Sequence, residues 1–490
     1  MPPKTSQKTG PAPAKKRAGR IARKASGSPA EFIPADSLTP PPVPPPMAPV
    51  VGGADCFDAG AVAERLGLWW TNAKEGAYHM PAPDGRWLEL NGPNIRAALM
   101  ADGIEGKRPK DAPLSDLDRV LLFTREHRAV DMPLHGLAGY FAGCHLIGGR
   151  RVLVRTSPRI IKAEASPGGW PVWDAFLTGI LGLQKWHFLA WVKLGYEALV
   201  TGSRDRGQVC LLCGPRGGGK SRLQHFLLTP AFGGRAADPV AWLFGDDRFC
   251  DDLAGAEHLA SEDPPAITKG EVRAHLKERL KALAVDDNFR VAAKFARAEN
   301  LDPWWRVSVS LNDSADAMRM LPSLTHDLAD KVLLFRTMAA ALPMPTNTPA
   351  ERRAFRETLA AELPALLYDL TETDDLKNQH PHLFGGRFGL REYADPELAA
   401  RLREDAPEME LWDLIERCID PGEEWTGSAS DLEGRLQSQS SPVTESATRF
   451  FRKMGAAKLL GRLAAEMPGV VVRERSADAR WWCIKRPSPL

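Results

Sequence analysis

The chain has 490 residues, too many for one compact domain, so we expect two or three domains. Hydrophobic residues make up 43% and charged residues 26%, the balance of a globular protein, and no apolar stretch approaches the roughly 18 residues of a membrane-spanning helix. The formal net charge of +2 hides a basic N-terminal arm, because Lys and Arg recur before Glu31 without any acidic residue.

Residues 1–52 are rich in Pro, Ala, Lys and Ser and have no periodic apolar pattern, which predicts a disordered tail. Its basic charge favours a polyanionic partner, and a solubilising tail without a partner is the alternative. The charges precede prolines instead of an apolar segment, so the sequence indicates no signal peptide. We therefore expect a cytoplasmic protein with no membrane partner.

Residues 53–170 form a predicted N-terminal accessory domain of mixed α and β structure. A helical pattern covers Ala61 to Leu68, and apolar residues alternate from Gly85 to Leu90. The segment 57–170 contains no constellation of acids, histidines or nucleophiles that indicates a catalytic site.

Residues 171–345 alternate helical and strand patterns, which predicts an α/β core with a parallel sheet. A helix is expected from Trp186 to Leu199, and strands are expected at Gln208–Cys213, Ala256–Ala260 and Trp305–Leu311. Cys210 and Cys213 are the only closely spaced cysteines. No second ligand pair accompanies them, so buried strand residues are favoured over a zinc site.

Helical patterns dominate residues 346–422, especially from Pro349 to Cys418. The last segment, 423–490, shows a helical pattern over Ser446–Ala465 followed by strand patterns at Val470–Val472 and Ala479–Ile484. Helices followed by a hairpin predict a small winged-helix domain.

A glycine-rich loop follows the predicted strand that ends at Cys213 and precedes a helical pattern. Glycines let the backbone amides turn inward around phosphates, and the Lys and Ser at the end of the motif suit the β and γ phosphates and Mg²⁺ respectively. The motif therefore predicts a P-loop NTPase that uses ATP and Mg²⁺. The residues expected to contact nucleotide are Gly214, Pro215, Arg216, Gly217, Gly218, Gly219, Lys220, Ser221 and Arg222.

Two acids, Glu262 and Asp263, end the next apolar strand pattern. Hydrolysis needs an acid on Mg²⁺ and a group that orients the attacking water, so we assign the pair jointly to these roles, with Asp263 and Ser221 as metal ligands. A solvated acidic turn before Pro264 is the alternative. In that case Asp246–Asp247 or Asp251–Asp252 would replace the pair.

Asn312 follows the strand pattern Trp305–Leu311. An amide there both donates and accepts hydrogen bonds without charge, which suits a group that holds the lytic water or senses the γ phosphate. An ordinary turn residue is the alternative.

In this order of motifs, residues 60–490 resemble the superfamily 3 helicases, especially the phage and plasmid primase-helicase family related to the poxvirus-type enzymes. The likeness is strongest from Gln208 to Arg336. It implies an AAA+-like core that assembles into a ring, with six subunits expected and nucleotide at their interfaces. It also implies a DNA-contacting hairpin between the acids and Asn312, for which the candidates are Lys281, Arg290 and Lys294.

The chain departs from the family pattern at two places. Pro264 stands where relatives often have a further acid, which leaves open which carboxylate acts as the base. Lys331 stands where some relatives carry the arginine finger, so Lys331 and Arg336 are both candidates. A surface salt bridge is the alternative for either, and a lysine lacks the planar fork of arginine.

The C-terminal segment also resembles the winged-helix end of the family. Its last long helix carries basic residues that suit phosphate contact, with solvated charges as the alternative. These residues are Arg449, Arg452, Lys453 and Lys458.

Together these features predict an ATP-dependent DNA helicase or translocase of phage or plasmid-type replication, in a bacterial or phage-infected cell. Its partners would be single-stranded or forked DNA, further copies of the chain and, since residues 57–170 lack an acidic metal motif, a separate primase or polymerase. One alternative is a non-helicase P-loop ATPase, such as a loader or a defence NTPase. Another is a DNA-binding initiator with a structural ATP site, against which the intact Lys220 and Ser221 argue.

Overall fold

The computed structural model describes residues 57–486, apart from a set of internal segments. The described residues belong to one compact unit, Ala54–Leu490, and contain three regions of regular structure. The first and the last region each have one hydrophobic cluster, and the central region has two. The segments left out are 73–75, 84, 246–250, 265–269, 287–288, 292–298, 315–316, 319–320, 322–323, 325, 405–406, 439–443, 445–446, 449, 452–454 and 476–479.

The first region combines three helices with a four-stranded sheet of order β3-β2-β1-β4. Its apolar cluster joins Ala63, Ile95 and Leu121, one from each helix, to Tyr78 of the sheet. The elements are α1 (Ala59–Arg65), β1 (Trp69–Thr71), β2 (Ala77–Pro81), β3 (Trp87–Leu90), α2 (Gly92–Ala101), α3 (Asp116–His127) and β4 (Ala129–Val130).

A three-stranded sheet of order β5-β7-β6 comes next, with β5 Met132–Leu134, β6 Gly143–Ile147 and β7 Arg150–Val154. Val152 and Val154 pack into the same apolar cluster as the central sheet. Fully buried Glu257 accepts hydrogen bonds from Gly139 N at 3.0 Å and from Arg235 Nε at 2.9 Å. Since a buried carboxylate is stable only when paired, this contact ties the β5–β7 segment to the central sheet.

The central sheet has six strands in the order β15-β14-β8-β13-β10-β9, and all paired neighbours are parallel. The expected α/β core with a parallel sheet is therefore present. The strands are β8 (Val209–Cys213), β9 (Ala236–Ala237), β10 (His258–Glu262), β13 (Arg306–Leu311), β14 (Val332–Arg336) and β15 (Tyr393–Ala394). β10 begins and ends two residues later than predicted, and β15 is a strand inside the region predicted to be helical.

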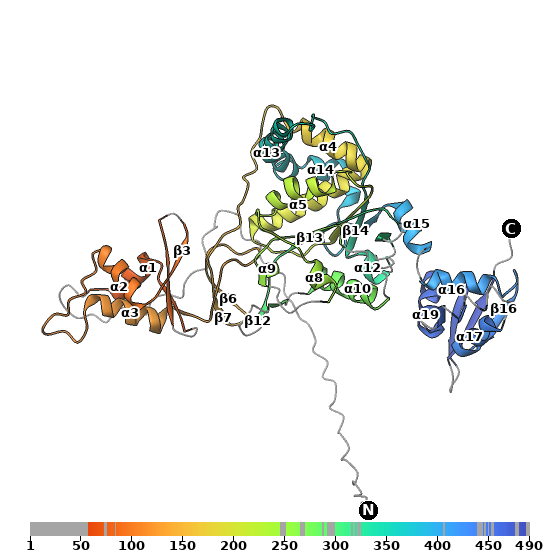
Figure 1. The fold of residues 1–490 in the computed structure, drawn as a ribbon, viewed down its shortest axis with the longest axis horizontal. Helices are drawn as coiled ribbons and strands as arrows, with labels where there is room; N and C mark the ends of the chain where they lie inside the picture. Colours follow the sequence, from red (N-terminus) through yellow and green to blue (C-terminus); the bar gives the residue numbers. More distant parts are fainter. Residues whose placement is uncertain are drawn as a thin grey trace, which may run out of the picture. The chain divides into compact units, whose positions relative to one another are not determined.

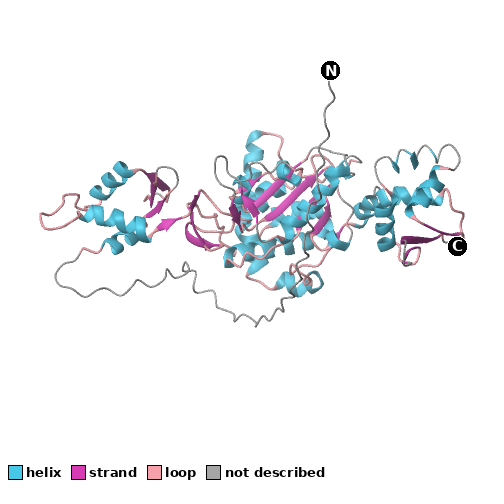
Figure 2. Ribbon diagram, turned by 90° about the horizontal axis from the view of Figure 1, so that it is seen from below, coloured by secondary structure: helices cyan, strands magenta, loops and turns pink. Residues whose placement is uncertain are grey.

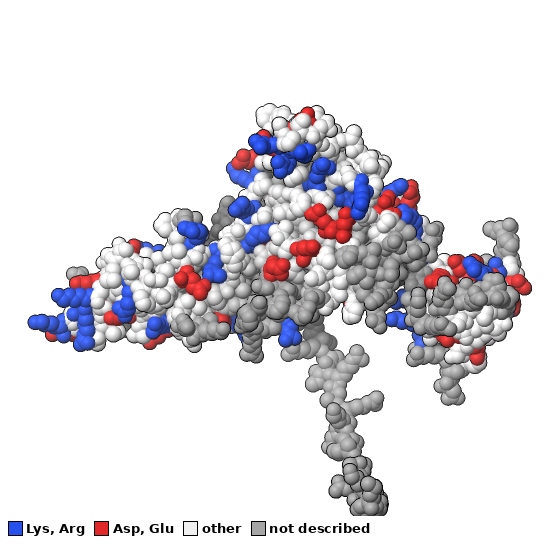
Figure 3. Space-filling view, viewed as in Figure 1, with Lys and Arg blue, Asp and Glu red and all other residues white. Residues whose placement is uncertain are grey.

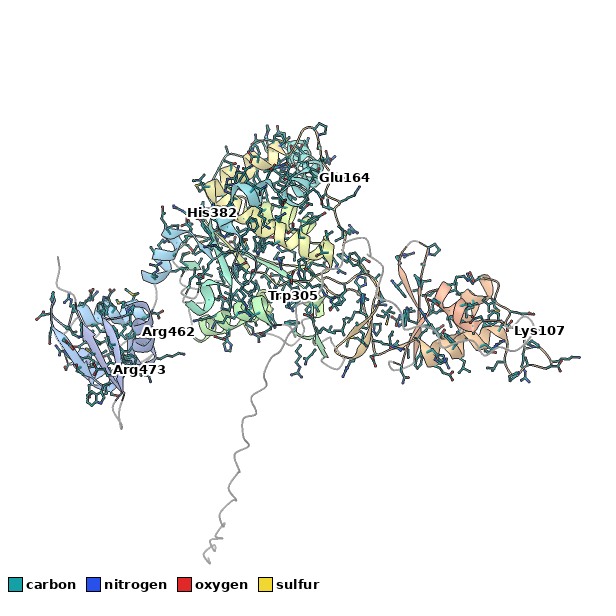
Figure 4. The ribbon with its side chains drawn as sticks, turned by 180° about the vertical axis from the view of Figure 1, so that it is seen from behind. Lys107, Glu164, Trp305, His382, Arg462 and Arg473 are labelled. Atoms are coloured by element: carbon teal, nitrogen blue, oxygen red, sulfur yellow. The ribbon has the colours of Figure 1, made fainter. Side chains whose placement is uncertain are left out.

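Helices cover both faces of this sheet (Figures 1 and 2). β8 is buried along its whole length, and its alternate residues enter different clusters, Cys210 and Leu212 on one face and Leu211 and Cys213 on the other. α4 (Pro171–Leu181), α5 (Lys185–Thr201) and α13 (Pro349–Thr371) pack on the first face, and α8 (Val240–Leu243) and α10 (Gly270–Val285) pack on the second. Trp305, directly before β13 and labelled in Figure 4, belongs to the cluster on the second face, together with α8 and α10.

Shorter elements connect these parts. A continuous helical segment, which we call the loop helix, follows β8 and consists of α6 (Lys220–Leu223), the π-helical turn η2 (Gln224–Leu228) and α7 (Thr229–Ala231). The remaining elements are η1 (Gly182–Gln184), α9 (Asp251–Ala254), the antiparallel pair β11 (Phe289–Val291) and β12 (Glu299–Leu301), α12 (His326–Ala329), α14 (Asp375–Gln379), η3 (Pro381–Leu383) and α15 (Pro396–Glu404).

The C-terminal region has its own apolar cluster and an antiparallel sheet of order β16-β18-β17. α19 and β17 carry Arg462 and Arg473 (Figure 4). Leu411 and Ile415 of α16 also belong to this cluster, which therefore includes residues before position 423. The elements are α16 (Pro407–Glu416), β16 (Glu424–Gly427), α17 (Ala429–Gln437), α19 (Ala456–Glu466), β17 (Val471–Arg475) and β18 (Arg480–Lys485).

None of the helices described in the structure combines the length and the apolarity that crossing a bilayer requires.

Candidate nucleotide-binding site

The strand order brings the three sequence motifs to one edge of the central sheet. β13 lies between β8 and β10, with Leu311 opposite Cys213 and Ser310 opposite Glu262. Because the strands are parallel, the glycine-rich loop after β8, Asn312 after β13 and the acids at the end of β10 all leave the sheet at its carboxyl edge. Ligands of open α/β sheets bind at this edge.

Close packing explains two of the glycines in the loop. A Cβ atom on Gly214 would lie 2.1 Å from the carbonyl oxygen of Thr337, which follows β14. Gly219 has a φ of +84°, and a Cβ there would lie 2.5 Å from Ile180 Cδ1 of α4. Side chains at these positions would therefore displace the loop from its neighbours.

Lys220 begins the loop helix, and its side chain is folded onto the glycine-rich loop. Its Nζ atom donates to the carbonyl oxygens of Gly214 and Pro215, each at 2.8 Å. Burial lowers the pKa of Lys220, and the charges of Asp263 and Asp313 act in the opposite direction. The ammonium group is thus held by weak backbone acceptors beside two carboxylates, and a phosphate anion is a better partner for it.

The two acids at the end of β10 face different neighbours. Asp263 has a φ of +43°, an uncommon conformation for a non-glycine residue, and its amide donates to Ser310 O at 3.1 Å. Its charge acts on Lys220, whereas that of Glu262 acts on Asp238, whose pKa is raised mainly by burial. Backbone strain of this kind clusters at functional sites.

Glu262 contacts the loop helix directly. His225 Nε2 lies 2.5 Å from Glu262 Oε1, and both side chains are partly open to solvent. Neither Asp238 nor His225 was among the predicted site residues.

Asn312 has a buried side-chain oxygen. Its Oδ1 atom has no hydrogen-bond partner within the described part of the chain. An unsatisfied buried acceptor is costly, so this atom is suited to accept a hydrogen bond from a water molecule or a ligand.

A buried polar network fixes the loop helix against the strands that carry the acids and Asn312. Gln224 Nε2 donates to Ser261 O at 3.1 Å and to Ser308 Oγ at 2.9 Å, and its Oε1 accepts from Ser310 Oγ at 2.9 Å. The network connects both strands to the residues directly after the glycine-rich loop. Gln224 lies in the π-helical turn, a feature that often marks functional sites.

The residues present fit a nucleotide-bound Mg²⁺. No cluster of three or more His, Cys, Asp or Glu suited to a metal occurs among the described residues. Mg²⁺ typically takes one or two protein oxygens together with substrate phosphates and water, and Ser221 and Asp263 supply such oxygens at this edge. Cys210 and Cys213 lie buried in β8, where burial raises the pKa of both thiols.

The two candidates for the arginine finger lie at opposite edges of the central sheet. Lys331 precedes β14 at the amino edge of the sheet, where its carbonyl accepts from Val209 N, and its Nζ lies 2.5 Å from Asp330 Oδ1. Arg336 ends β14 at the carboxyl edge, and its guanidinium pairs with Glu397 of α15. Arg401, further along α15, donates to Asp313 O at 2.9 Å and was not predicted.

The predicted DNA contacts are placed only in part. Lys281 lies on α10 and pairs with Glu278 at 3.3 Å, and Arg290 lies exposed on β11. Arg290 is opposite Asn300 in the β11–β12 pair, whose connection, including Lys294, lies outside the described residues. Asp246–Asp247 and three of the four basic residues of the C-terminal helix, Arg449, Arg452 and Lys453, also lie outside them.

Comparison with known proteins finds no matching family model and no matching curated protein. Among solved structures, the apo C-terminal region of NrS-1 aligns with a TM-score of 0.48 and 12% identity over 87% of this chain and 98% of that one. A structure described as the active helicase Cch of SCCmec type IV gives 0.41 and 10%, over 85% and 92%. JCV helicase with a bound small molecule gives 0.19 and 14%, over 49% and 67%. Likenesses at this level assign the chain to no family.

Proposed function

We propose that this protein is an ATP-hydrolysing DNA helicase or translocase. The observation that carries the proposal is the meeting of the glycine-rich loop, the two acids and Asn312 at one edge of a parallel sheet, with β13 between β8 and β10. ATP hydrolysis needs a phosphate cradle, a metal ligand and a group that orients water within reach of one another.

Each residue of the site has a distinct role in this proposal. Lys220 leaves the carbonyls of Gly214 and Pro215 and binds the β and γ phosphates. Ser221 and Asp263 would hold Mg²⁺, which would neutralise charge on the phosphates. Glu262 orients the attacking water and accepts its proton, and Asn312 Oδ1 accepts a hydrogen bond from the same water.

The antiparallel pair β11–β12 supports action on DNA. It lies in the chain between the acids and β13, and it carries the exposed Arg290. A motor that moves along any sequence needs point charges that contact the sugar-phosphate backbone, and Lys281, Arg290 and Lys294 are the candidates. On the face drawn in Figure 3, acidic and basic side chains are interspersed, and we assign DNA contact to the local group of Lys281, Arg290 and Lys294.

Further parts of the proposal concern assembly and the flanking regions. We propose a ring, with six subunits as the expected number, in which Lys331 or Arg336 reaches the nucleotide of a neighbour. The C-terminal region is proposed as a winged helix, which its helices and three-stranded antiparallel sheet support. The first region is proposed as an accessory domain, and a phage or plasmid replicon as the setting.

The test is ATP turnover by the full chain with and without single-stranded DNA, together with strand displacement on a forked substrate. We expect Mg²⁺-dependent turnover that DNA stimulates, and unwinding that requires ATP. Turnover without unwinding would favour a loader or defence NTPase, and nucleotide binding without turnover would favour a DNA-binding initiator.

A further inference from the structure

Two large apolar side chains are exposed on segments next to the glycine-rich loop. Leu183, in the turn between α4 and α5, is 91% exposed, and Met338, two residues after β14, is 42% exposed. We call these two side chains the apolar patch. Exposed apolar groups that adjoin a polar site often mark a ligand-binding surface.

Met338 connects the turn that carries Leu183 to the glycine-rich loop. Met338 N donates to Ile180 O at 2.9 Å, and a Cβ on Gly182 would lie 3.3 Å from the methyl carbon of Met338. A Cβ on Gly218 would lie 3.4 Å from Met338 O. The backbone of Met338 therefore lies between the turn that carries Leu183 and the loop that would hold the phosphates.

The direction in which the phosphates of a bound nucleotide run places its nucleobase on the β14 side of the loop. β8 has β13 on one side and β14 on the other. The acids and Asn312 lie on the β13 side, so the terminal phosphate of a bound nucleotide must face that way. The ribose and base then leave toward β14, where Thr337 and Met338 follow the strand.

Two polar side chains next to the apolar patch, Gln184 and Lys185, are already engaged, and Thr337 Oγ1, which has no partner among the described residues, is buried away from solvent. Gln184 Nε2 donates to Arg336 O at 3.0 Å and to Leu181 O at 3.3 Å, and its Oε1 accepts from Arg336 N at 3.0 Å. Lys185 Nζ donates to Asp174 Oδ1 at 2.7 Å and to Thr178 Oγ1 at 2.8 Å. Neither side chain is therefore available to form hydrogen bonds with the edge of a base.

We propose that the apolar patch holds the nucleobase of the bound nucleotide by contact with its ring face, without reading its hydrogen-bonding edge. The inference rests on the proposed nucleotide site and states which nucleoside triphosphates that site accepts. Sites that hydrogen-bond a substrate reject analogues by about 10⁴-fold or more, whereas apolar contacts discriminate far less. The site should therefore accept purine and pyrimidine nucleoside triphosphates.

The test measures equilibrium binding of ATP, GTP, CTP and inorganic tripolyphosphate to the full chain with Mg²⁺. We expect affinities for the three nucleotides within about tenfold of one another. Leu183→Ser and Met338→Ser should each weaken all three by about fivefold, because each loses apolar contact with the base. Tripolyphosphate affinity should not change. Leu146→Ser is the matched control, since Leu146 is 75% exposed on β6.

Two results would overturn the inference while leaving the nucleotide site intact. One is a preference for ATP over GTP of more than about 100-fold, which requires a hydrogen-bonded base edge. The other is unchanged nucleotide affinity in both variants, and a simultaneous change in sedimentation would then show that a second copy covers the apolar patch. If the wild type binds neither ATP nor tripolyphosphate, the proposed function itself fails.

Discussion

His225 Nε2 and Glu262 Oε1 lie 2.5 Å apart, so the loop helix contacts the side chain proposed to orient the attacking water. The contact links a residue close after Lys220 to the end of β10. An imidazole in this place restricts the rotamers of the carboxylate, which matters because a catalytic group must be held in its productive geometry.

We expect His225→Ala to lower kcat for ATP about three- to tenfold with less than a twofold change in KM, since orientation is lost and the phosphate contacts remain. Steady-state turnover at several ATP concentrations measures this split. His127→Ala, at an exposed position on α3, serves as the control. An unchanged kcat would show that the contact has no catalytic role.

Lys220→Ala should reduce ATP turnover by at least about 100-fold, because it removes the positive charge proposed to bind the phosphates. Among the described residues, the hydrogen bonds of this side chain go to the loop itself, so the fold should survive. Turnover and circular dichroism are the measurements. Wild-type turnover with an unchanged spectrum would refute the site.

Substitutions of the two acids, Glu262 and Asp263, should differ in their effect on nucleotide binding. Glu262→Gln should abolish turnover and retain nucleotide binding, because its carboxylate faces His225 and Asp238 and not Lys220. Asp263→Asn should also weaken Mg²⁺-dependent binding, since this acid is the proposed metal ligand. Binding and turnover measured across a Mg²⁺ titration test both expectations. If both variants hydrolyse ATP normally, the catalytic acids lie elsewhere.

DNA contact by the β11–β12 segment predicts that Arg290→Ala and Lys294→Ala weaken single-stranded DNA binding about equally for different sequences. Each variant should flatten the dependence of log affinity on log salt by a slope of about one per lost phosphate contact. Basal turnover should remain. Lys107→Ala, at an exposed position in the first region, is the control (Figure 4). Salt slopes identical to the wild type would mean that these charges are only solvated.

His258 predicts a pH dependence of stability. It is fully buried on β10, with Nδ1 2.7 Å from Thr229 Oγ1 and Nε2 2.7 Å from Ser308 Oγ, and burial lowers its pKa to about 3. The unfolded chain binds a proton near pH 6.5 and the folded one does not. The contribution of His258 is therefore fully present above pH 6.5 and falls between pH 6.5 and 3, by up to about 1.4 kcal/mol per pH unit.

His258→Asn should lower the urea midpoint at pH 7 and reduce its decline between pH 7 and 5, because the titrating group is gone. Tryptophan fluorescence follows the transition, since the His258 ring contacts Phe232, whose ring in turn contacts Trp304. His127→Asn should keep the wild-type pH profile. An equal decline in all three proteins would assign the pH dependence to other groups.

The parts of the site set by local sequence were predictable. The strand Val209–Cys213 and the glycine-rich loop follow from a short apolar run, backbone freedom and a helical pattern. The parallel α/β core also followed from the alternation of elements. The order of the strands in the sheet could not be predicted from the sequence. β8 pairs with β13 and β14, both distant in the chain, and no local pattern specifies such partners.

Contacts between residues far apart in the chain could not be predicted from the sequence either. His225 is five positions after Lys220, so in a regular α-helix its side chain points well away from that of Lys220, and no local pattern links it to Glu262 at the end of β10. Arg401 meets Asp313 only because β15 adds to the sheet edge and leads into α15. A two-residue strand such as Tyr393–Ala394 has no periodicity to detect, so its region was predicted to be helical.

The pairing of β8 also constrains how the protein is made. Both hydrogen-bonding neighbours of β8 lie later in the chain, and β14 ends at Arg336. A ribosome therefore releases the glycine-rich loop long before the strands that support it. The first region can fold as soon as it emerges, because its cluster closes within its own residues. The apolar β8 must wait unpaired, which makes the interval between Cys213 and Arg336 the stage of synthesis most exposed to aggregation and most dependent on chaperones.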